Sequence, residues 1–232
     1  MEFIIINDGS TDDSLDIIRK YERLDSRIVV INQDNIGLTK SLNVGVKNSS
    51  GQYIARQDAD DRSDLNRLEN QLDVLKKFHL DIVTSRAFKG NKITPNNLIF
   101  YFNQSNILKA GNIFIHGTFF MDRRVFDTQI YNEKYKYAQD FKFILDAFSN
   151  NFRIGSMLEP LYYLNNIETS ISNTKKDEQD KFVSVALNSF FGSDIYFLYI
   201  NKCNKHFQSV CKFIFILYLY INFKGDVFKV IK

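Results

Sequence analysis

Asp58, Asp60 and Asp61 place three carboxylates within four residues, directly after the strand-like segment 52–56. In α/β proteins, ligand sites lie at the carboxyl ends of such strands. Crowded carboxylates repel one another unless a cation lies among them, and oxygen ligands favour hard metals such as Mg²⁺ or Mn²⁺. Because Mg²⁺ usually binds one or two carboxylates plus substrate phosphates, the segment indicates a metal–diphosphate site. The alternative is a plain acidic turn in which Asp61 or Asp64 caps the following helix.

Short apolar runs alternate with amphipathic segments around these carboxylates, and this pattern must position them. We expect strands at 2–6, 27–31, 53–57, 81–85, 113–121, 152–157 and 161–164. Four helices are expected. The first follows a capping box at Ser10 and Asp13, the second spans 38–47, the third carries an apolar repeat and the fourth begins near Gln139. That repeat consists of Leu65, Leu68, Leu72, Leu75 and Phe78. The alternation predicts an α/β fold, Rossmann-like, with a mostly parallel sheet and helices on both faces.

Composition narrows the class of protein. The 232 residues are 44% hydrophobic, which is ample for a core. Two cysteines, Cys203 and Cys211, argue against a disulfide scaffold or a zinc site and suit a reducing cytoplasm. Residues 197–232 hold six lysines and one acidic residue, whereas the other 196 residues carry a net charge of −2. The net charge of the main body therefore argues against nucleic-acid binding. The amino-terminal residues do not have the pattern of a signal peptide.

The order of several motifs resembles that of the family 2 glycosyltransferases, which have the GT-A fold and act in bacterial capsule and lipopolysaccharide synthesis. The resembling segments are Ile-Asn-Asp-Gly-Ser-Thr-Asp (6–12), Tyr-Ile-Ala-Arg-Gln-Asp-Ala-Asp-Asp (53–61), Tyr-Ala-Gln-Asp-Phe (137–141) and Glu-Pro-Leu-Tyr-Tyr (159–163). The resemblance covers roughly residues 2–172. It implies inverting transfer of a sugar from a nucleotide-diphosphate donor to an acceptor hydroxyl. The expected donor is a UDP-sugar.

The resemblance also implies roles on the donor side. Asp8 accepts a hydrogen bond from the pyrimidine, or is simply a turn residue. Lys40 and Arg56 face the diphosphate, or are plain surface cations. Asp58 holds the ribose or a metal-bound water. Asp60 binds Mn²⁺ or Mg²⁺, which offsets charge on the departing nucleotide diphosphate.

Asp140 is the expected general base, at the start of the last helix of the domain. A carboxylate there accepts the proton of the attacking acceptor hydroxyl, and a helix N-terminus favours its ionised form. The same position also suits a helix cap without chemistry. Gln139 stands where the family more often has Glu. His116 either lines the donor-sugar site or is a satisfied buried histidine.

Two departures from the family pattern bear on activity. Family members carry an earlier strand and helix, about thirty residues that would end just before Glu2. The missing strand is central in the family's sheet, so we expect unpaired backbone where it belongs and a chain that behaves as a fragment. Asn165 and Ile167 stand where the family often has Arg and His.

The carboxyl-terminal part is expected to be a separate helical extension, residues 173–232, after a catalytic domain at 1–172. Residues 213–221 form a nine-residue apolar and aromatic run beside lysines, too short for a membrane crossing, which needs ~20 residues. Residues 205–224 therefore either lie on an anionic membrane surface or pack on the catalytic domain.

The sequence thus predicts a cytoplasmic glycosyltransferase, at the inner face of the plasma membrane if the tail binds there. Its partners would be a UDP-sugar and a saccharide or lipid-linked acceptor of a growing surface polysaccharide. The alternative is a truncated, inactive remnant that still binds nucleotide sugar. A phosphoryl-transfer domain is disfavoured because the chain lacks a G-x-x-x-x-G-K-[ST] loop.

Overall fold

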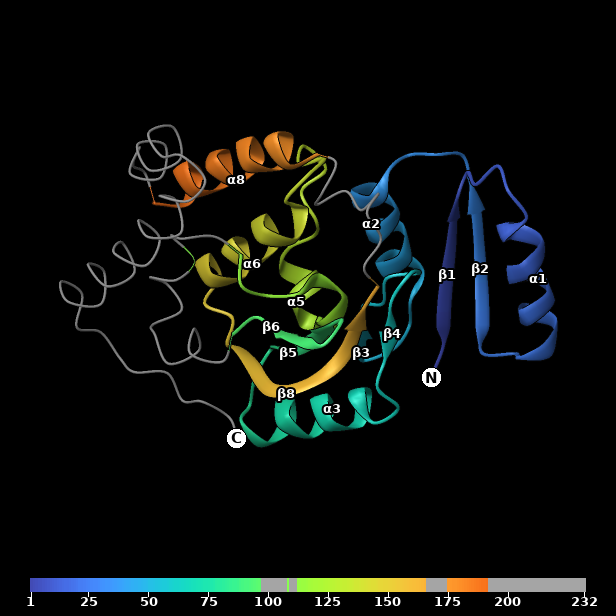
Figure 1. The fold of residues 1–232 in the computed structure, drawn as a ribbon, viewed down its shortest axis with the longest axis horizontal. Helices are drawn as coiled ribbons and strands as arrows, with labels where there is room; N and C mark the ends of the chain where they lie inside the picture. The colour runs from blue at the N-terminus through green and yellow to red at the C-terminus, as the bar shows by residue number, and fades with distance from the viewer. Residues whose placement is uncertain (97–107, 109–111, 166–174, 192–232) are drawn as a thin grey trace.

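A computed structural model describes residues 1–96, 108, 112–165 and 175–191 (Figure 1). The strands are β1 (Phe3–Asp8), β2 (Ile28–Gln33), β3 (Tyr53–Ala55), β4 (Arg62–Ser63), β5 (Ile82–Lys89), β6 (Lys92–Thr94), β7 (Phe120–Asp122) and β8 (Ile154–Leu164). The helices are α1 (Ser14–Leu24), α2 (Leu38–Asn48), α3 (Arg67–Lys77), the 3-10 turn η2 (His116–Thr118), α5 (Arg124–Thr128), α6 (Gln139–Ser149) and α8 (Lys176–Phe191).

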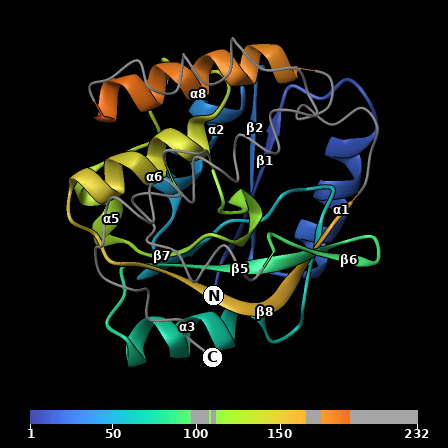
Figure 2. The ribbon, with the colours of Figure 1, turned by 60° about the vertical axis from the view of Figure 1, so that its left-hand side comes forward.

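The strands form two sheets. One has the order β3-β7-β5-β8-β4, with β6 on the edge of β5, and the other consists of β1 and β2. Figure 2 shows α6 and α8 on one side of the larger sheet and α3 on the other. The predicted α/β class with helices on both faces is therefore confirmed. Pairing is more mixed than expected: β1–β2 and β5–β8 are parallel, whereas β7 runs antiparallel to both β3 and β5.

The expected region of unpaired backbone lies between β1 and β3. Among the described strands, β1 pairs with β2 alone and β3 pairs with β7 alone. Figure 1 shows β1 between β2 and the six-stranded sheet, with α1 on the outer side. The described residues between 2 and 164 therefore form two sheets that no described strand joins.

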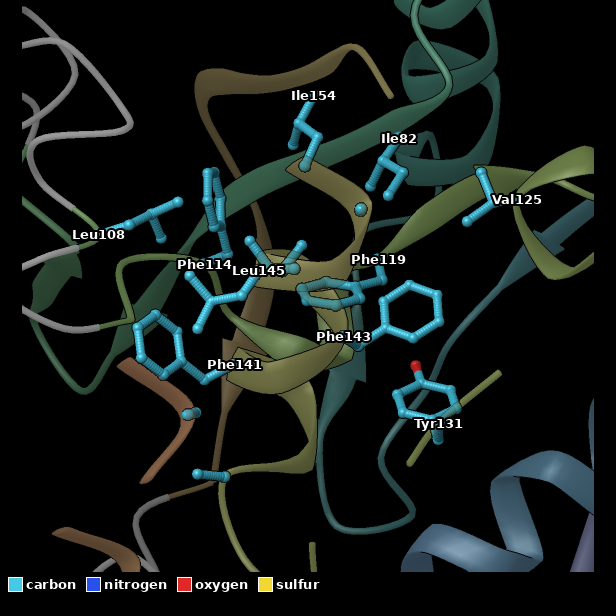
Figure 3. Packing of buried hydrophobic residues seen from close by; sticks show 14 of the residues in the cluster. Ile82, Leu108, Phe114, Phe119, Val125, Tyr131, Phe141, Phe143, Leu145 and Ile154 are labelled. Carbon is cyan, nitrogen blue, oxygen red and sulfur yellow. The ribbon is translucent and has the colours of Figure 1, made fainter. Parts of the chain in front are cut away.

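The main hydrophobic core lies between α6 and the larger sheet. Phe141, Phe143, Ile144 and Leu145 of α6 expose almost no surface, because an 11-residue helix buries one broad apolar face there. Figure 3 shows these side chains among residues from the strands and loops around them. This core fixes the start of α6, where Asp140 lies, against the end of the larger sheet.

Helix α3 buries Leu75 as expected, and Leu68 and Leu72 of the expected repeat pack against the same hydrophobic cluster. Its buried positions are Arg67, Gln71 and Leu75, one turn apart. Leu65 precedes the helix and is 100% exposed, and Phe78 is 37% exposed. The apolar repeat therefore located the inner face of α3, but it did not reveal the two buried polar side chains, which bond to backbone carbonyl groups beneath the site.

Other predicted elements differ at their boundaries. The strand expected over 113–121 is instead η2 followed by the short β7, and the strands expected at 152–157 and 161–164 are one irregular strand, β8. The expected capping box is wrong. The helix begins at Ser14, whose N–H donates to Asp12 Oδ1 at 3.0 Å, and no side chain caps α1.

Helix α8 lies beyond the predicted boundary at residue 172, yet it contributes to the main core. Ala186 and Leu187 are buried in the same cluster as the α6 residues. The division into domains at 1–172 and 173–232 stays a prediction, and residues 205–224 lie outside the described part of the chain. Of the helices that the structure describes, none is both long enough and apolar enough to cross a bilayer.

The orientation of α3 leads to a stability prediction. Leu75→Ala removes a side chain that is 4% exposed, so we expect a loss of about 2–5 kcal/mol in the free energy of unfolding. Leu65→Ala, on the same segment but fully exposed, should change it by less than about 0.5 kcal/mol. Urea unfolding followed by circular dichroism measures both. Equal losses would contradict this orientation.

Candidate active site

The ends of β3, η2 and α6 bring four of the predicted site residues into one electrostatic cluster. Arg56 forms an ion pair with Asp58 at 2.5 Å, and its charge also acts on His116 and Asp140. Tyr131 belongs to the same cluster, since it interacts with Arg56, Asp58 and Asp140. Segments 53–61 and 137–141, which are far apart in the chain, therefore meet with His116 at one end of the larger sheet.

Arg56 lies beneath this end of the sheet. It exposes only 8% of its surface, and its backbone N–H donates to Phe119 O at 2.8 Å across the β3–β7 pair. Burial works to lower the pKa of the guanidinium, and the adjacent Asp58 outweighs it, so that the net pKa is raised. Within the described chain, Nε and Nη1 are buried and have no hydrogen-bond partner. Arg56 is thus a buried cation that orients Asp58, and contact with a diphosphate stays a prediction.

Asp140 lies in the first turn of α6, directly after Gln139 and Ala138. Burial raises the pKa of its carboxyl group, although bonds from backbone N–H groups, the charge of Arg56 and a bond from Asn112 act in the opposite direction. Asn112 Nδ2 donates to Asp140 Oδ2 at 2.7 Å. Ala138 has a φ of 55°, a left-handed conformation that costs an L-residue about 1–2 kcal/mol. The chain therefore holds a carboxyl group with an elevated pKa in a fixed orientation, as a general base requires.

His116 has its polar contact inside the protein. Its Nε2 lies 2.9 Å from Tyr131 Oη, and its ring lies edge-on to Phe119 with centroids 5.0 Å apart. Burial, with a smaller contribution from Arg56, holds the pKa of His116 well below its usual value. The imidazole is therefore neutral at pH 7. These contacts account for His116 without a ligand, and its part in sugar binding stays a prediction.

Asp8 lies at the end of β1 and fixes the loop that leads into α2. Its Oδ1 accepts from Gln33 Nε2 at 2.8 Å and Ile36 N–H at 3.0 Å, and Oδ2 accepts from Gly37 N–H at 2.9 Å. Burial acts to raise the pKa of Asp8, but these bonds outweigh burial and lower it. Asp8 is thus an ionised carboxylate in a rigid setting. Lys40 is exposed on α2, and the roles of both in donor binding stay predictions.

The carboxylates of the acidic loop, residues 58–61, differ in their surroundings: Asp61 bonds to the protein backbone, whereas Asp60 is exposed to solvent. Asp61 Oδ1 accepts from Asn165 N–H at 2.7 Å, which ties the loop to the end of β8. Burial and the nearby charges of Asp60 and Asp58 raise the pKa of Asp61. Asp60 is exposed, and no described side chain bonds to it. The alternative of a helix cap holds only in part: Asp64 Oδ1 accepts from Asn66 N–H at 2.9 Å just before α3, whereas the Asn66 side chain makes no capping bond.

The described residues include no group of three or more histidine, cysteine, aspartate or glutamate side chains that could hold a metal ion. Asp60 would therefore act with at most one further carboxylate. This donor set fits Mg²⁺ or Mn²⁺ when phosphate oxygens supply other ligands, because such ions commonly use only one or two protein carboxylates. The carboxylates of the acidic loop also repel one another, and a bound cation would reduce this repulsion.

Tyr162 is a site-shaping residue that the sequence did not reveal. Its hydroxyl accepts from Asp58 N–H at 3.0 Å and from Gln57 Nε2 at 3.2 Å. The ring passes so close to Gly117 that a Cβ there would lie 2.3 Å from the Tyr162 hydroxyl oxygen. Tyr162 thus supports the acidic loop from below, and glycine is required at 117 to make room for it.

Arg67 is the second buried cation beneath the site. Its Nη1 donates to Gly117 O at 2.8 Å and its Nη2 to Arg56 O at 3.1 Å. Burial lowers the pKa of Arg67 to about 10, so it stays charged at pH 7. The guanidinium lies over the Tyr162 ring, 5.4 Å from its centroid. Arg67 therefore joins α3, η2 and the end of β3 into one support.

The loop support can be tested by Tyr162→Phe. The change leaves the Asp58 N–H without its acceptor, so we expect a loss of about 1–3 kcal/mol in unfolding free energy and faster hydrogen exchange at the Asp58 amide. Tyr163→Phe is the matched control, because its ring is 38% exposed and stacks on Phe88. Exchange at Asp58 measured by NMR should not change in that control. An unchanged Asp58 amide in Tyr162→Phe would overturn the assigned support.

Comparison with known proteins places this arrangement in a family. The family model described as "Glycosyl transferase family 2" matches residues 1–130. The minor teichoic acid biosynthesis protein GgaA of Bacillus subtilis (strain 168) is 27% identical over 256 residues, covering 99% of this chain and 54% of that protein. The chain spans about half the length of several curated relatives that it matches.

Solved structures agree on the fold. S. aureus TarS 1–349 in complex with UDP-GlcNAc has a TM-score of 0.62 at 19% identity, covering 91% of this chain and 70% of TarS. The mannosyltransferase PcManGT from Pyrobaculum calidifontis, in complex with GDP-Man and Mn²⁺, has a TM-score of 0.59 at 12% identity, covering 97% of this chain and 79% of that one. At these identities the likeness concerns the fold. With the family match over more than half of its residues, this chain belongs to glycosyl transferase family 2 and has the GT-A fold.

Proposed function

We propose that this protein transfers a sugar from a nucleotide-diphosphate donor to an acceptor hydroxyl with inversion at the anomeric carbon. The observation that carries the proposal is Asp140, a carboxyl group with a raised pKa that Asn112 holds in place beside the Arg56–Asp58 ion pair. One-step inversion needs a base for the acceptor hydroxyl and groups that bind the donor. Asp140 would be the base, and the carboxylates of residues 58–61 would bind the donor. Hexosyl transfer is the proposed class.

The donor half consists of the acidic loop and the residues that support it. Asp58 is oriented by Arg56 and by Tyr162, and it would contact the ribose or a metal-bound water. Asp60, which is exposed, would hold Mn²⁺ or Mg²⁺ together with the diphosphate. That ion would supply Lewis-acid stabilisation of the departing nucleotide diphosphate. The Mn²⁺ complex of PcManGT supports this choice of cofactor.

A UDP-sugar is the proposed donor. TarS, which shares the fold, was solved with UDP-GlcNAc. In this chain the ionised Asp8, with its carboxylate fixed by the loop before α2, would accept a hydrogen bond from the N–H of the pyrimidine. Lys40 on the same helix would add positive charge toward the diphosphate. Neither contact changes the role proposed for Asp140.

In the acceptor half, Asp140 would take the proton of the attacking hydroxyl as the new glycosidic bond forms and the bond to the nucleotide diphosphate breaks. A raised pKa makes the carboxylate a stronger base than ordinary aspartate. The Asn112 bond fixes its orientation. Asn112 is thus a positioning residue for the base.

The proposed acceptor is a saccharide or lipid-linked hydroxyl of a growing surface polysaccharide. The printed role of GgaA in minor teichoic acid biosynthesis supports this class. Such an acceptor suits action at the cytoplasmic face of a membrane, with residues 205–224 as the proposed contact. The competing proposal, favoured by the separation of β1–β2 from the larger sheet, is a chain that binds nucleotide sugar without transferring it.

Asp140→Asn tests the proposed transfer. We expect turnover of UDP-sugars to fall by about 10²–10⁴-fold, because the amide cannot accept the proton, while calorimetric binding of UDP with Mn²⁺ persists and is lost in EDTA. Wild-type turnover should also decline on acidification, through a pKa above that of ordinary aspartate, because the base becomes protonated.

Asp146→Asn is the matched control on the same helix. Asp146 forms an ion pair with Lys142, which lies one turn before it. Its turnover should stay close to that of wild type. Binding of UDP without turnover in the wild type would support the competing proposal. Full turnover in Asp140→Asn would exclude Asp140 as the base.

A further inference from the structure

Four side chains line up across neighbouring strands at one end of the larger sheet. In the strand registers Arg62 of β4 pairs with Tyr163 of β8, and Tyr163 pairs with Phe88 of β5. Phe88 in turn pairs with Ile93 of β6. Because cross-strand partners project from the same face of a sheet, these four residues form one continuous cross-strand row.

The cross-strand row projects from the face of the sheet that carries α6. Ile82 packs in the same cluster as the α6 residues, whereas its neighbour Val83 packs in the cluster that α3 covers. Successive residues of a strand point to opposite faces, so Phe88, at an even spacing from Ile82 along β5, faces the α6 side. Figure 2 shows the two faces, with α6 and α8 on one and α3 on the other.

The aromatic rings of the row are stacked, and they orient the Arg62 guanidinium. Tyr163 stacks on Phe88 with ring centroids 5.0 Å apart, and Arg62 Cζ lies 5.5 Å from the Tyr163 centroid. Since β8 lies between β5 and β4, these two contacts occupy opposite sides of the Tyr163 ring. The outward surface of the row therefore consists of the guanidinium and of ring edges, which carry partial positive charge.

Arg62 lacks an anionic partner in the described part of the chain. Asp60 and Asp61 directly precede it, yet no described carboxylate forms an ion pair with its guanidinium. Arg62 and Tyr163 are both exposed. A guanidinium that rests on an aromatic face keeps its N–H edge for two parallel hydrogen bonds, the geometry that recognises a phosphate or a carboxylate. The row thus offers an oriented site for an oxyanion.

The row borders the candidate active site. Arg62 directly follows the acidic loop, and Asp61 Oδ1 accepts from the N–H of Asn165, two residues after Tyr163, at 2.7 Å. The row also projects from the same side of the sheet as α6, whose first turn carries Asp140. A molecule bound on the row therefore lies on the side of the proposed base, where the proposed reaction needs its acceptor.

We propose that the cross-strand row is an acceptor subsite, and that the acceptor is a saccharide with a phosphate or carboxylate group that Arg62 binds. Tyr163 and Phe88 are positioning residues, because they hold the guanidinium in its orientation. The inference rests on the proposed sugar transfer and narrows its acceptor to an anionic saccharide. A neutral acceptor would leave Arg62 without an ionic partner.

Glucose, glucose 6-phosphate and glucuronate test the subsite, because they share one ring and differ in charge. Titration of each into the full chain is followed by NMR of the Arg62 Nε–H and of the ring protons of Tyr163 and Phe88. We expect at least one anionic sugar to bind about three- to tenfold more tightly than glucose, through hydrogen bonds between charged groups. Arg62→Gln should abolish that preference.

Matched variants separate the row from general charge effects. Arg23→Gln removes the same charge from an exposed position on α1 and should keep the preference for the anionic sugar. Tyr163→Phe should also keep it, since the ring that supports the guanidinium is retained, whereas Tyr163→Leu should reduce it. UDP calorimetry on the same variants reports the donor site separately.

A preference for an anionic sugar that depends on Arg62, with unchanged UDP binding, supports the subsite even where turnover is absent, which would count against the proposed transfer alone. Equal binding of all three sugars, or a preference lost equally in Arg23→Gln, overturns it. Absence of shifts along the row in a folded chain overturns it as well, whether or not UDP binds. A matched loss of UDP affinity in Arg62→Gln also overturns it, because Arg62 then serves the donor diphosphate.

Discussion

The ion pair between buried Arg56 and Asp58 is the interaction on which the candidate site depends. Burying a cation is unfavourable unless a nearby anion compensates it, and Asp58 lies 2.5 Å away. The same charge acts on Asp140, partly offsetting the effect of burial on its pKa, and it adds to the burial that lowers the pKa of His116. One guanidinium therefore links the acidic loop to the proposed base, so that the two parts of the candidate site share one electrostatic environment.

Polar side chains beneath this cluster hold its backbone in place. Arg67 reaches from α3 to carbonyl groups of η2 and of Arg56, and Tyr162 reaches from β8 to the acidic loop. Gly117 leaves room for the Tyr162 ring. The apolar core around α6 supports the site from the other side of the sheet. Loss of any of these supports would displace the carboxylates without touching them.

The sequence predicted the features that depend on residues close together in the chain. The period of apolar residues located α2, α6 and most strands, and the motif order located Asp8, Arg56, Asp58 and Asp140 near strand or helix ends. Periodicity located the apolar face of α3 but not buried Arg67 and Gln71, which donate to distant carbonyls that the sequence does not indicate. Asn112 and Tyr162 were missed for the same reason, since each acts on a residue far away in the chain. The open edge beside β1 was predictable because it follows from motif order.

Arg56 and burial together act on the proton affinity of Asp140, in opposite directions. An NMR titration of carboxyl-labelled aspartate, in wild type and in Arg56→Met, tests it most directly, with Arg124→Met as the control because Arg124 is exposed and pairs with Asp81 and Asp122. We expect a pKa for Asp140 above that of ordinary aspartate, a further rise in Arg56→Met, and no change in Arg124→Met. An ordinary or lowered pKa in wild type, or a folded Arg56→Met protein with an unmoved Asp140, would contradict it.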